Sequence, residues 1–256
     1  MARLRLKTGS ILGTFGKGVD GSISLNFDVS GGDNCDIACP HHPDSTAENA
    51  TNACYAARAE IRPDRSQLAA KLDRHGAMPP FLVVNRALFE IHELQRLGHK
   101  IPWLRISTNG SVPQPEQVDK SFRECFRRLL EWCRDSGIPV HFPTETYPKT
   151  RFYRALCGDL VTVRESVVDE KRFLRASGAV SVVVGSEGSS RIERVTEART
   201  VAQKRRERTG RKVVVCPAVL NSFAARRDPN LKNDRAKCGA CTACQHEEMD
   251  IVYPRH

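Results

Sequence analysis

The chain has 256 residues, and 40% of them are hydrophobic, which is enough to bury the core of one large domain or two small ones. Its formal net charge of +10 favours an anionic partner, and DNA or a nucleotide substrate is the first candidate. No apolar run approaches the roughly 20 residues that span a bilayer, and the basic N-terminal residues lack the apolar stretch of a signal peptide. We therefore expect a cytoplasmic protein without a membrane partner.

Hydrophobic patterning predicts strands that alternate with helices. Strands are expected at 22–29, 103–107, 138–144, 160–165, 179–185 and 212–219. Helices are expected at 54–75, 81–97, 115–135, 149–156, 169–176 and 190–208. This alternation predicts an α/β fold with right-handed crossovers and a parallel sheet. Patterning alone leaves open whether the six units form a partial barrel or an open doubly wound sheet.

The ten cysteines of the chain indicate metal or cluster ligation, because cytosolic thiols are kept reduced. A first group, Cys35-x3-Cys39 and then Cys54 after fourteen residues, directly follows the first predicted strand. It is expected at the carboxyl-terminal edge of the sheet, where α/β folds bind ligands. Three thiolates can hold three irons of a [4Fe–4S] cluster and leave the fourth iron open to another ligand.

A second group of cysteines lies where the alternating pattern ends. It consists of Cys216, which precedes a proline, and the run Cys238-x2-Cys241-x2-Cys244. This spacing is typical of ferredoxin-type ligation and predicts a closed second [4Fe–4S] cluster, with zinc as the less favoured metal. We therefore divide the chain into an α/β core, residues 1–219, and an auxiliary cluster segment, residues 220–256.

Three further cysteines, Cys125, Cys133 and Cys157, show no ligand spacing and are expected to pack in the core. Two arginines that precede the cluster run, Arg226 and Arg227, are candidates for contacts to phosphates. The sequence thus separates cysteines with a predicted chemical role from cysteines with a predicted packing role.

A strand, a three-cysteine segment and a series of βα units resemble the radical S-adenosylmethionine (SAM) enzymes. Cys35 and Cys39 match the first half of the family motif C-x3-C-x2-C. The triplet Cys54-Tyr55-Ala56 is similar to the third-cysteine region of phage-encoded members, and Tyr55 is a candidate cofactor contact. The longer spacing before Cys54 is tolerable because loop-closure entropy grows only logarithmically with length. The resemblance covers residues 22–245 and implies a partial (β/α)6 radical-SAM-type barrel with a cysteine-rich C-terminal extension.

The resemblance also implies where SAM binds. In the family a turn after the second strand holds the amino-acid end of SAM, and Asn109, Gly110 and Ser111 have that position here. Glu145 and Glu165 are predicted at strand ends, where a carboxylate can hold the SAM ribose or amino group or act on the substrate. Together with Tyr55, these five residues are the candidate cofactor site.

The activity implied by the resemblance begins with one-electron reduction of the first cluster by a donor protein of the flavodoxin or ferredoxin type. SAM is then cleaved to a 5′-deoxyadenosyl radical that abstracts hydrogen from the substrate. Because phage-encoded radical SAM isomerases hypermodify thymidine in DNA, we expect an isomerase or base-modifying enzyme, in the host cytoplasm if the chain is phage-encoded. Two alternatives stay open, a non-catalytic zinc or iron–sulfur nucleic-acid-binding protein and a metal-dependent hydrolase. The substrate identity and the oligomeric state are not predicted.

Overall fold

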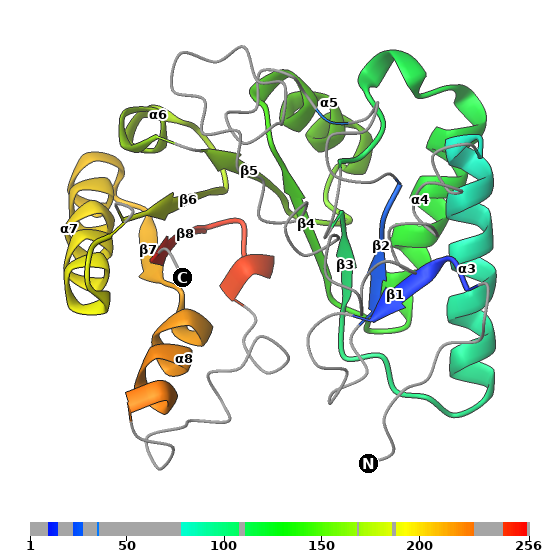
Figure 1. Cartoon of the computed structure of the whole chain (residues 1–256). Helices are drawn as coiled ribbons and strands as arrows, with labels where there is room; N and C mark the ends of the chain where they lie inside the picture. Colours follow the sequence, from blue (N-terminus) through cyan, green and yellow to red (C-terminus); the bar gives the residue numbers. More distant parts are fainter. Residues whose placement is uncertain are drawn as a thin grey trace. The chain divides into compact units, whose positions relative to one another are not determined.

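The computed structural model describes residues 10–14, 23–27, 35, 78–107, 111–167, 169–185, 188–227 and 243–254. The chain divides into two compact units, Met1–Val161 and Thr162–His256. In each unit strands alternate with helices, and most strand pairs are parallel (Figure 1). The predicted α/β class is therefore confirmed.

In the first unit the strand order is β1-β2-β3-β4 (Figure 1). Strands β2, β3 and β4 run parallel, whereas β1 is antiparallel to β2. The strands are β1 (Leu12–Thr14), β2 (Ile23–Leu25), β3 (Leu104–Ile106) and β4 (Val140–Thr144). The helices are α3 (Pro80–Arg96), the 3-10 helix η1 (Pro115–Gln117), α4 (Lys120–Asp135) and α5 (Tyr147–Cys157). The cysteine segment, the turn after β3 and Glu145 all belong to this unit.

An aromatic core joins the sheet of the first unit to α4 and α5. Helix α4 begins at the N-cap Asp119, whose carboxylate accepts a hydrogen bond from the backbone of Phe122 at 2.7 Å. Its buried stripe brings Phe126 against Phe142 of β4 and Tyr153 of α5, with ring centroids 5.7 and 6.0 Å apart. These edge-on contacts bury large apolar rings and fix α4 and α5 on one face of the sheet.

In the second unit the strand order is β5-β6-β8-β7, and all of its strand pairs are parallel. The strands are β5 (Val163–Val167), β6 (Val180–Val184), β7 (Lys212–Val215) and β8 (Met249–Pro254). The helices are α6 (Glu170–Arg175), α7 (Arg191–Thr209), α8 (Pro217–Arg227) and the 3-10 helix η4 (Ala243–Gln245). Helix α7 begins with a capping box between Ser190 and Glu193, which explains why its start was predictable.

The six predicted strands are present, although their bounds differ from the expected ones. The expected strand 160–165 lies at 163–167, and the expected strand 212–219 ends at Val215 because Pro217 begins α8. Strands β1 and β8 and helix α8 were not predicted. The expected helix 54–75 lies outside the described residues. None of the helices in the described part of the chain combines the length and the hydropathy that a membrane span requires.

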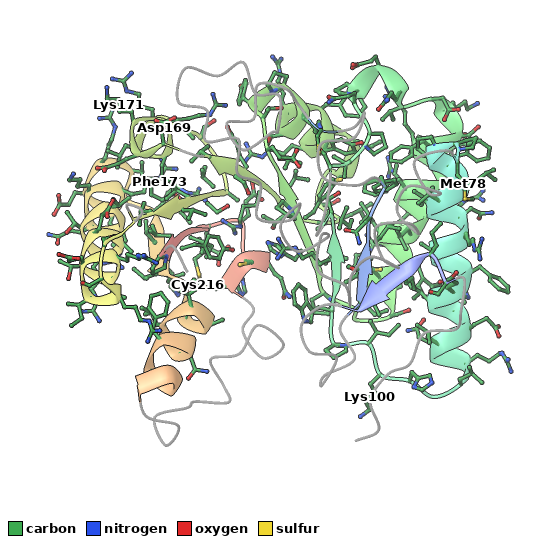
Figure 2. All side chains as sticks on the ribbon, in the orientation of Figure 1. Met78, Lys100, Asp169, Lys171, Phe173 and Cys216 are labelled. Carbon is green, nitrogen blue, oxygen red and sulfur yellow. The ribbon has the colours of Figure 1, made fainter. Side chains whose placement is uncertain are left out.

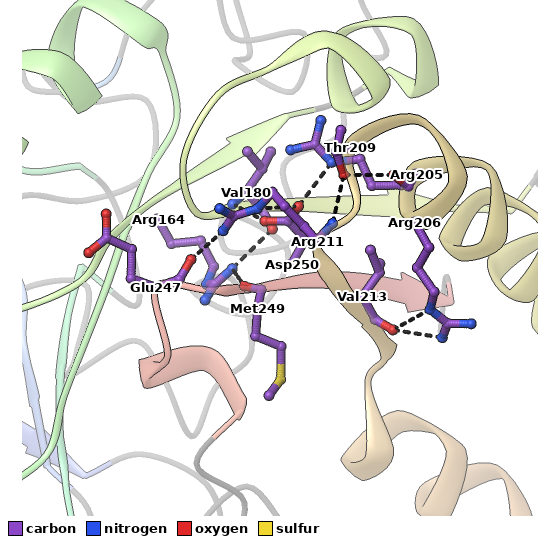
Figure 3. Close-up of polar contacts among 10 residues, drawn as sticks. All are labelled: Arg164, Val180, Arg205, Arg206, Thr209, Arg211, Val213, Glu247, Met249 and Asp250. Atoms are coloured by element: carbon purple, nitrogen blue, oxygen red, sulfur yellow. Dashed lines mark hydrogen bonds and ion pairs between the residues drawn. The ribbon is translucent and has the colours of Figure 1, made fainter.

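Strand β8 shows why the division at residue 219 needs a finer description. It pairs with β6 on one side and β7 on the other, so the end of the chain completes the sheet of the second unit. Its buried residue Asp250 binds the backbone N–H of Val180 at 3.1 Å and the side chains of Arg205 and Arg211 at 2.9 and 3.0 Å (Figure 3). The auxiliary cluster segment stays a prediction for residues 228–242, which lie outside the described residues.

Candidate functional site

The carboxyl ends of β2, β3 and β4 lie at one edge of the sheet of the first unit, because the three strands are parallel neighbours. Cys35 follows β2, Ser111 follows β3 and Glu145 directly follows β4. We call this part of the first unit the carboxyl edge. Ligands of α/β folds bind at such edges, so it is the candidate site.

A buried polar network joins two of the predicted residues at the carboxyl edge. The hydroxyl of Ser111 donates to Oε2 of Glu145 at 2.7 Å and accepts from the ammonium of Lys149 at 2.6 Å. The Lys149 ammonium also lies 3.7 Å from the Glu145 carboxylate. Sequence reasoning identified Ser111 and Glu145 but missed Lys149, whose role depends on the turn of α5 that brings it back toward Glu145.

Burial gives the members of this network different roles. The side chain of Lys149 is 1% exposed, so its charge needs the nearby carboxylate to offset its desolvation. Ser111 is completely buried, and its hydroxyl acts both as donor and as acceptor within the network. Glu145 is 28% exposed, and within the described residues its Oε1 oxygen accepts no hydrogen bond. Ser111 and Lys149 therefore position Glu145, which is the member that can reach a ligand.

Strain marks the end of β3 next to the predicted turn. Ser107 has a backbone φ of 54°, in the left-handed region that residues other than glycine seldom adopt. Its N–H is held by the carbonyl of Leu25 at 2.8 Å, while its buried hydroxyl has no partner among the described residues. Such outliers cost about 1–3 kcal/mol and concentrate at functional sites. Ser107 is thus a site residue that no sequence pattern indicated.

The sheet face opposite the aromatic core is polar near this edge. The register aligns Ser24 with Arg105 and Arg105 with His141 across β2, β3 and β4. Because side chains alternate along a strand, His141 and Phe142 point to opposite faces, and Phe142 belongs to the aromatic core. Ser24 and His141 are buried, so this second face has polar groups inside the unit rather than on its surface.

Most of the predicted first cluster site lies outside the described residues. Cys35 is described and half-buried, whereas Cys39, Cys54, Tyr55, Asn109 and Gly110 are not described. Their assigned roles stay predictions. Among the residues that are described, no group of three or more His, Cys, Asp or Glu side chains is arranged to hold a metal ion.

The expected position of Glu165 at a strand end is wrong. Glu165 lies in the middle of β5, is 1% exposed, and accepts a hydrogen bond from Nε of Arg172 at 2.8 Å. The strand runs two residues further than its polar sequence suggested because Ser166 is accommodated beside Ser181 of β6. Glu165 ties β5 to α6, and its assigned cofactor contact stays a prediction.

Two of the four cysteines predicted to hold the second iron–sulfur cluster pack in the same group of apolar side chains. Cys216, labelled in Figure 2 where β7 passes into α8, packs with Phe223 and Met249, and Cys244 of η4 packs against the same group. The sulfur of Cys244 also lies 3.0 Å from the hydroxyl of Tyr253. Cys238 and Cys241 are outside the described residues, so common ligation stays a prediction that this proximity supports.

Arg164 of β5 holds the segment that contains Cys244. Its completely buried guanidinium donates to the carbonyls of Met249 and Val180 at 2.7 and 3.0 Å (Figure 3). It also donates to the carbonyls of Cys244 and His246. Burial lowers the pKa of Arg164, and the neighbouring Cys244 thiol works against that shift. A strand residue 80 positions away thus fixes the backbone on which Cys244 lies.

The cysteines without ligand spacing behave as expected where they are buried. Cys133 and Cys157 are buried, and burial raises the pKa of each thiol to about 12. Burial thus favours the neutral thiol at both positions, which agrees with a packing role. Cys125 is half-buried on α4.

No family model, curated protein or solved structure matches the chain. A functional assignment therefore depends on the residues and contacts described above.

Proposed function

We propose that the chain is a radical SAM enzyme of the partial (β/α)6 barrel type that acts on a base of nucleic-acid origin. The observation that supports the proposal is the set of residues that follow the parallel strands at the carboxyl edge. The three-cysteine segment follows β2, the strained Ser107 ends β3, and Glu145 follows β4 with its buried supports. A cofactor at this edge would need ligands and a positioned carboxylate. The cysteine segment offers the ligands, and Glu145 offers the carboxylate on a neighbouring parallel strand.

The donor set fits an open iron–sulfur cluster. Cys35, Cys39 and Cys54 supply three thiolates, and a cluster with three protein ligands keeps one iron for SAM. When bound, the cluster and SAM supply the radical chemistry, and the protein supplies binding and orientation. The half-buried position of Cys35 is suited to a ligand that must exclude bulk water yet admit SAM.

Glu145 is the residue that we assign to cofactor recognition. Its Oε1 oxygen can accept a hydrogen bond from the ammonium or a ribose hydroxyl of SAM, because Oε2 is already engaged by Ser111. Ser111 and Lys149 hold the carboxylate in one orientation. The entropic cost of ordering this side chain on SAM binding is therefore smaller.

The second cysteine group is assigned to an auxiliary [4Fe–4S] cluster on Cys216, Cys238, Cys241 and Cys244. Two observations support a site at these residues. Cys216 and Cys244 pack in the same apolar group, and Arg164 donates a hydrogen bond to the backbone carbonyl of Cys244. Four thiolates close the coordination sphere, so this cluster would serve structure or electron transfer. The net charge of +10 supports a polyanionic substrate.

Anaerobic reconstitution tests the proposal. We expect iron and sulfide for two clusters, and 5′-deoxyadenosine from SAM once a strong reductant is added. Cys35→Ala should abolish 5′-deoxyadenosine and lower the iron content, whereas Cys125→Ala, a half-buried cysteine without ligand spacing, should match the wild type. Protein that binds zinc and forms no 5′-deoxyadenosine would instead favour a non-catalytic nucleic-acid-binding protein.

A further inference from the structure

Helix α5 presents two faces of different character. The face toward the core has Lys149, Thr150, Tyr153 and Cys157, all of which are buried. The other face lines a surface hollow with a volume of ≈ 420 Å³, formed by Tyr147, Pro148, Arg151, Phe152 and Ala155. These positions follow helical spacing, so they form one continuous stripe along α5. The aromatic core and the polar network at the carboxyl edge do not use this stripe.

Two aromatic rings give the hollow its chemistry. Tyr147 is 45% exposed, so its ring is accessible to a ligand. Phe152 is half-buried and fixed from below by an edge-on contact with Tyr153, with centroids 5.2 Å apart. The guanidinium of Arg123 lies 5.2 Å from the centroid of the Phe152 ring. The Phe152 ring is therefore held in place, whereas the exposed Tyr147 ring at the start of α5 is accessible, and both rings can stack against flat groups.

Positive charge surrounds these rings. Arg151 lines the hollow and is exposed, and Arg123 and Arg127 project from the neighbouring helix α4. The ion pair of Arg127 with Glu131, at 3.7 Å, is exposed on both sides and leaves most of its charge available. Residues 120–157 contain eight Lys or Arg and four Asp or Glu. An apolar ligand alone would not need this charge, whereas phosphates would.

The hollow begins beside the candidate site. Helix α5 starts at Tyr147, two residues after Glu145 and the end of β4. A base that enters the carboxyl edge therefore has its neighbouring nucleotides within reach of α5. A base in a duplex must be extruded before it reaches a buried site, and the single-stranded form exposes the faces on which aromatic rings stack.

We infer that Tyr147, Phe152 and Arg151, together with Arg123, form a stacking site for single-stranded nucleic acid that flanks the reacting base. The rings stack on one base, and the guanidinium groups bind the adjacent phosphates. This inference rests on the proposed function and deepens it, because it names the form of the substrate. It assigns a binding role to side chains that take no part in holding SAM.

Fluorescence anisotropy with a labelled oligothymidylate of about 12 nucleotides tests the site, since one binding fold covers about 4–16 nucleotides. Tyr147→Ala should weaken binding at least about five-fold, because loss of one stacked base costs about 1–3 kcal/mol. Arg151→Ala should also reduce the slope of log affinity against log salt by about 0.7, the value for one phosphate contact on a single strand. A duplex of the same length should bind more weakly than the single strand.

Matched controls come from exposed residues elsewhere in the chain. Phe89→Ala on α3 removes an aromatic ring that is 66% exposed, and Arg199→Ala on α7 removes an exposed arginine. Both should bind oligothymidylate as the wild type does. Equal binding by wild type, Tyr147→Ala and Arg151→Ala, or no binding by the wild type, overturns the inference.

The two proposals fail in different ways. Binding is measured without reductant, and SAM cleavage is measured without nucleic acid. Weak binding by Tyr147→Ala in a protein that forms no 5′-deoxyadenosine supports the stacking site while rejecting the radical SAM function. Normal 5′-deoxyadenosine formation with unchanged oligothymidylate binding supports the enzyme and rejects the stacking site.

Discussion

Two charge networks among the described residues differ in how exposed their carboxylate is. In the second unit Asp250 lies between Arg205 and Arg211, and the side chains of Asp250 and Arg205 are both 0% exposed. At the carboxyl edge of the first unit Lys149 is equally buried, but its partner Glu145 is 28% exposed. In the network of the second unit, which we call the closed network, the Asp250 carboxylate is shielded from solvent and holds the fold together, although its partner Arg211 is 24% exposed. At the carboxyl edge the Glu145 carboxylate instead presents a positioned oxygen to solvent. The difference in exposure separates a structural role from a functional one.

The largest effect is expected from breaking the closed network. Asp250→Ala leaves the buried guanidinium of Arg205 and the partly exposed one of Arg211 without their carboxylate, and it should lower the free energy of unfolding by about 3–5 kcal/mol. Urea unfolding followed by circular dichroism measures the change. Asp135→Ala, which removes an exposed carboxylate paired with Arg134, should cost less than about 1 kcal/mol. Equal losses in the two variants would contradict the assigned difference.

Arg164→Met tests whether the second unit also supports the auxiliary cluster. The change leaves the carbonyls of Cys244 and His246 without their buried donor, and we expect a loss of about 2–3 kcal/mol. Reconstituted protein should lose the iron of the second [4Fe–4S] cluster and keep the iron of the first cluster. The exposed Arg199→Met is the control for both measurements. Unchanged iron content would show that Arg164 serves the fold alone.

At the carboxyl edge, Glu145→Gln should change the affinity for SAM more than the free energy of unfolding. The amide keeps an oxygen that accepts from Ser111, but it removes the charge, so we expect about 1 kcal/mol of destabilisation. Binding of SAM to reconstituted protein should weaken about ten-fold or more, since a charge-assisted hydrogen bond is lost. Isothermal titration calorimetry measures this, with the exposed Glu116→Gln as control. An affinity equal to the wild type would remove Glu145 from the site.

The smallest effect is expected at Ser107. Glycine adopts the left-handed backbone without steric cost, and Ser107→Gly should raise the free energy of unfolding by about 1 kcal/mol after the entropy of the unfolded chain is included. Denaturant midpoints measure the gain. Ser136→Gly, at the C-cap of α4 with a φ of −86°, is a control without positive φ and should not be stabilising. A destabilised Ser107→Gly protein would argue against strain at this position.

The sequence predicted the parts of the fold that depend on local patterns. The continuous apolar run of β6 and the cap at Ser190 belong to single segments, and both elements are present. Strand β8 escaped prediction because Asp250 breaks its apolar pattern, and only distant arginines make that residue tolerable inside a sheet. Sequence patterns contain no information on such long-range compensation.

The same limit applies to the candidate site. Ser111 and Glu145 were predicted because each follows a strand, which is a local property. Lys149 and Arg164 were missed because their partners are brought close only by the fold, and Glu165 was misplaced because its partner Arg172 lies on the next helix. Residues whose role depends on a distant partner are those that only the structure reveals.

The most direct test of the central claim is electron–nuclear double resonance of the reduced, reconstituted protein with SAM labelled with ¹⁵N at its amino group. If the first cluster keeps an open iron at the carboxyl edge, the cluster signal should show a hyperfine coupling to the ¹⁵N nucleus, and Cys35→Ala should lack it. A reduced cluster with no coupling to labelled SAM in the wild type would contradict the account.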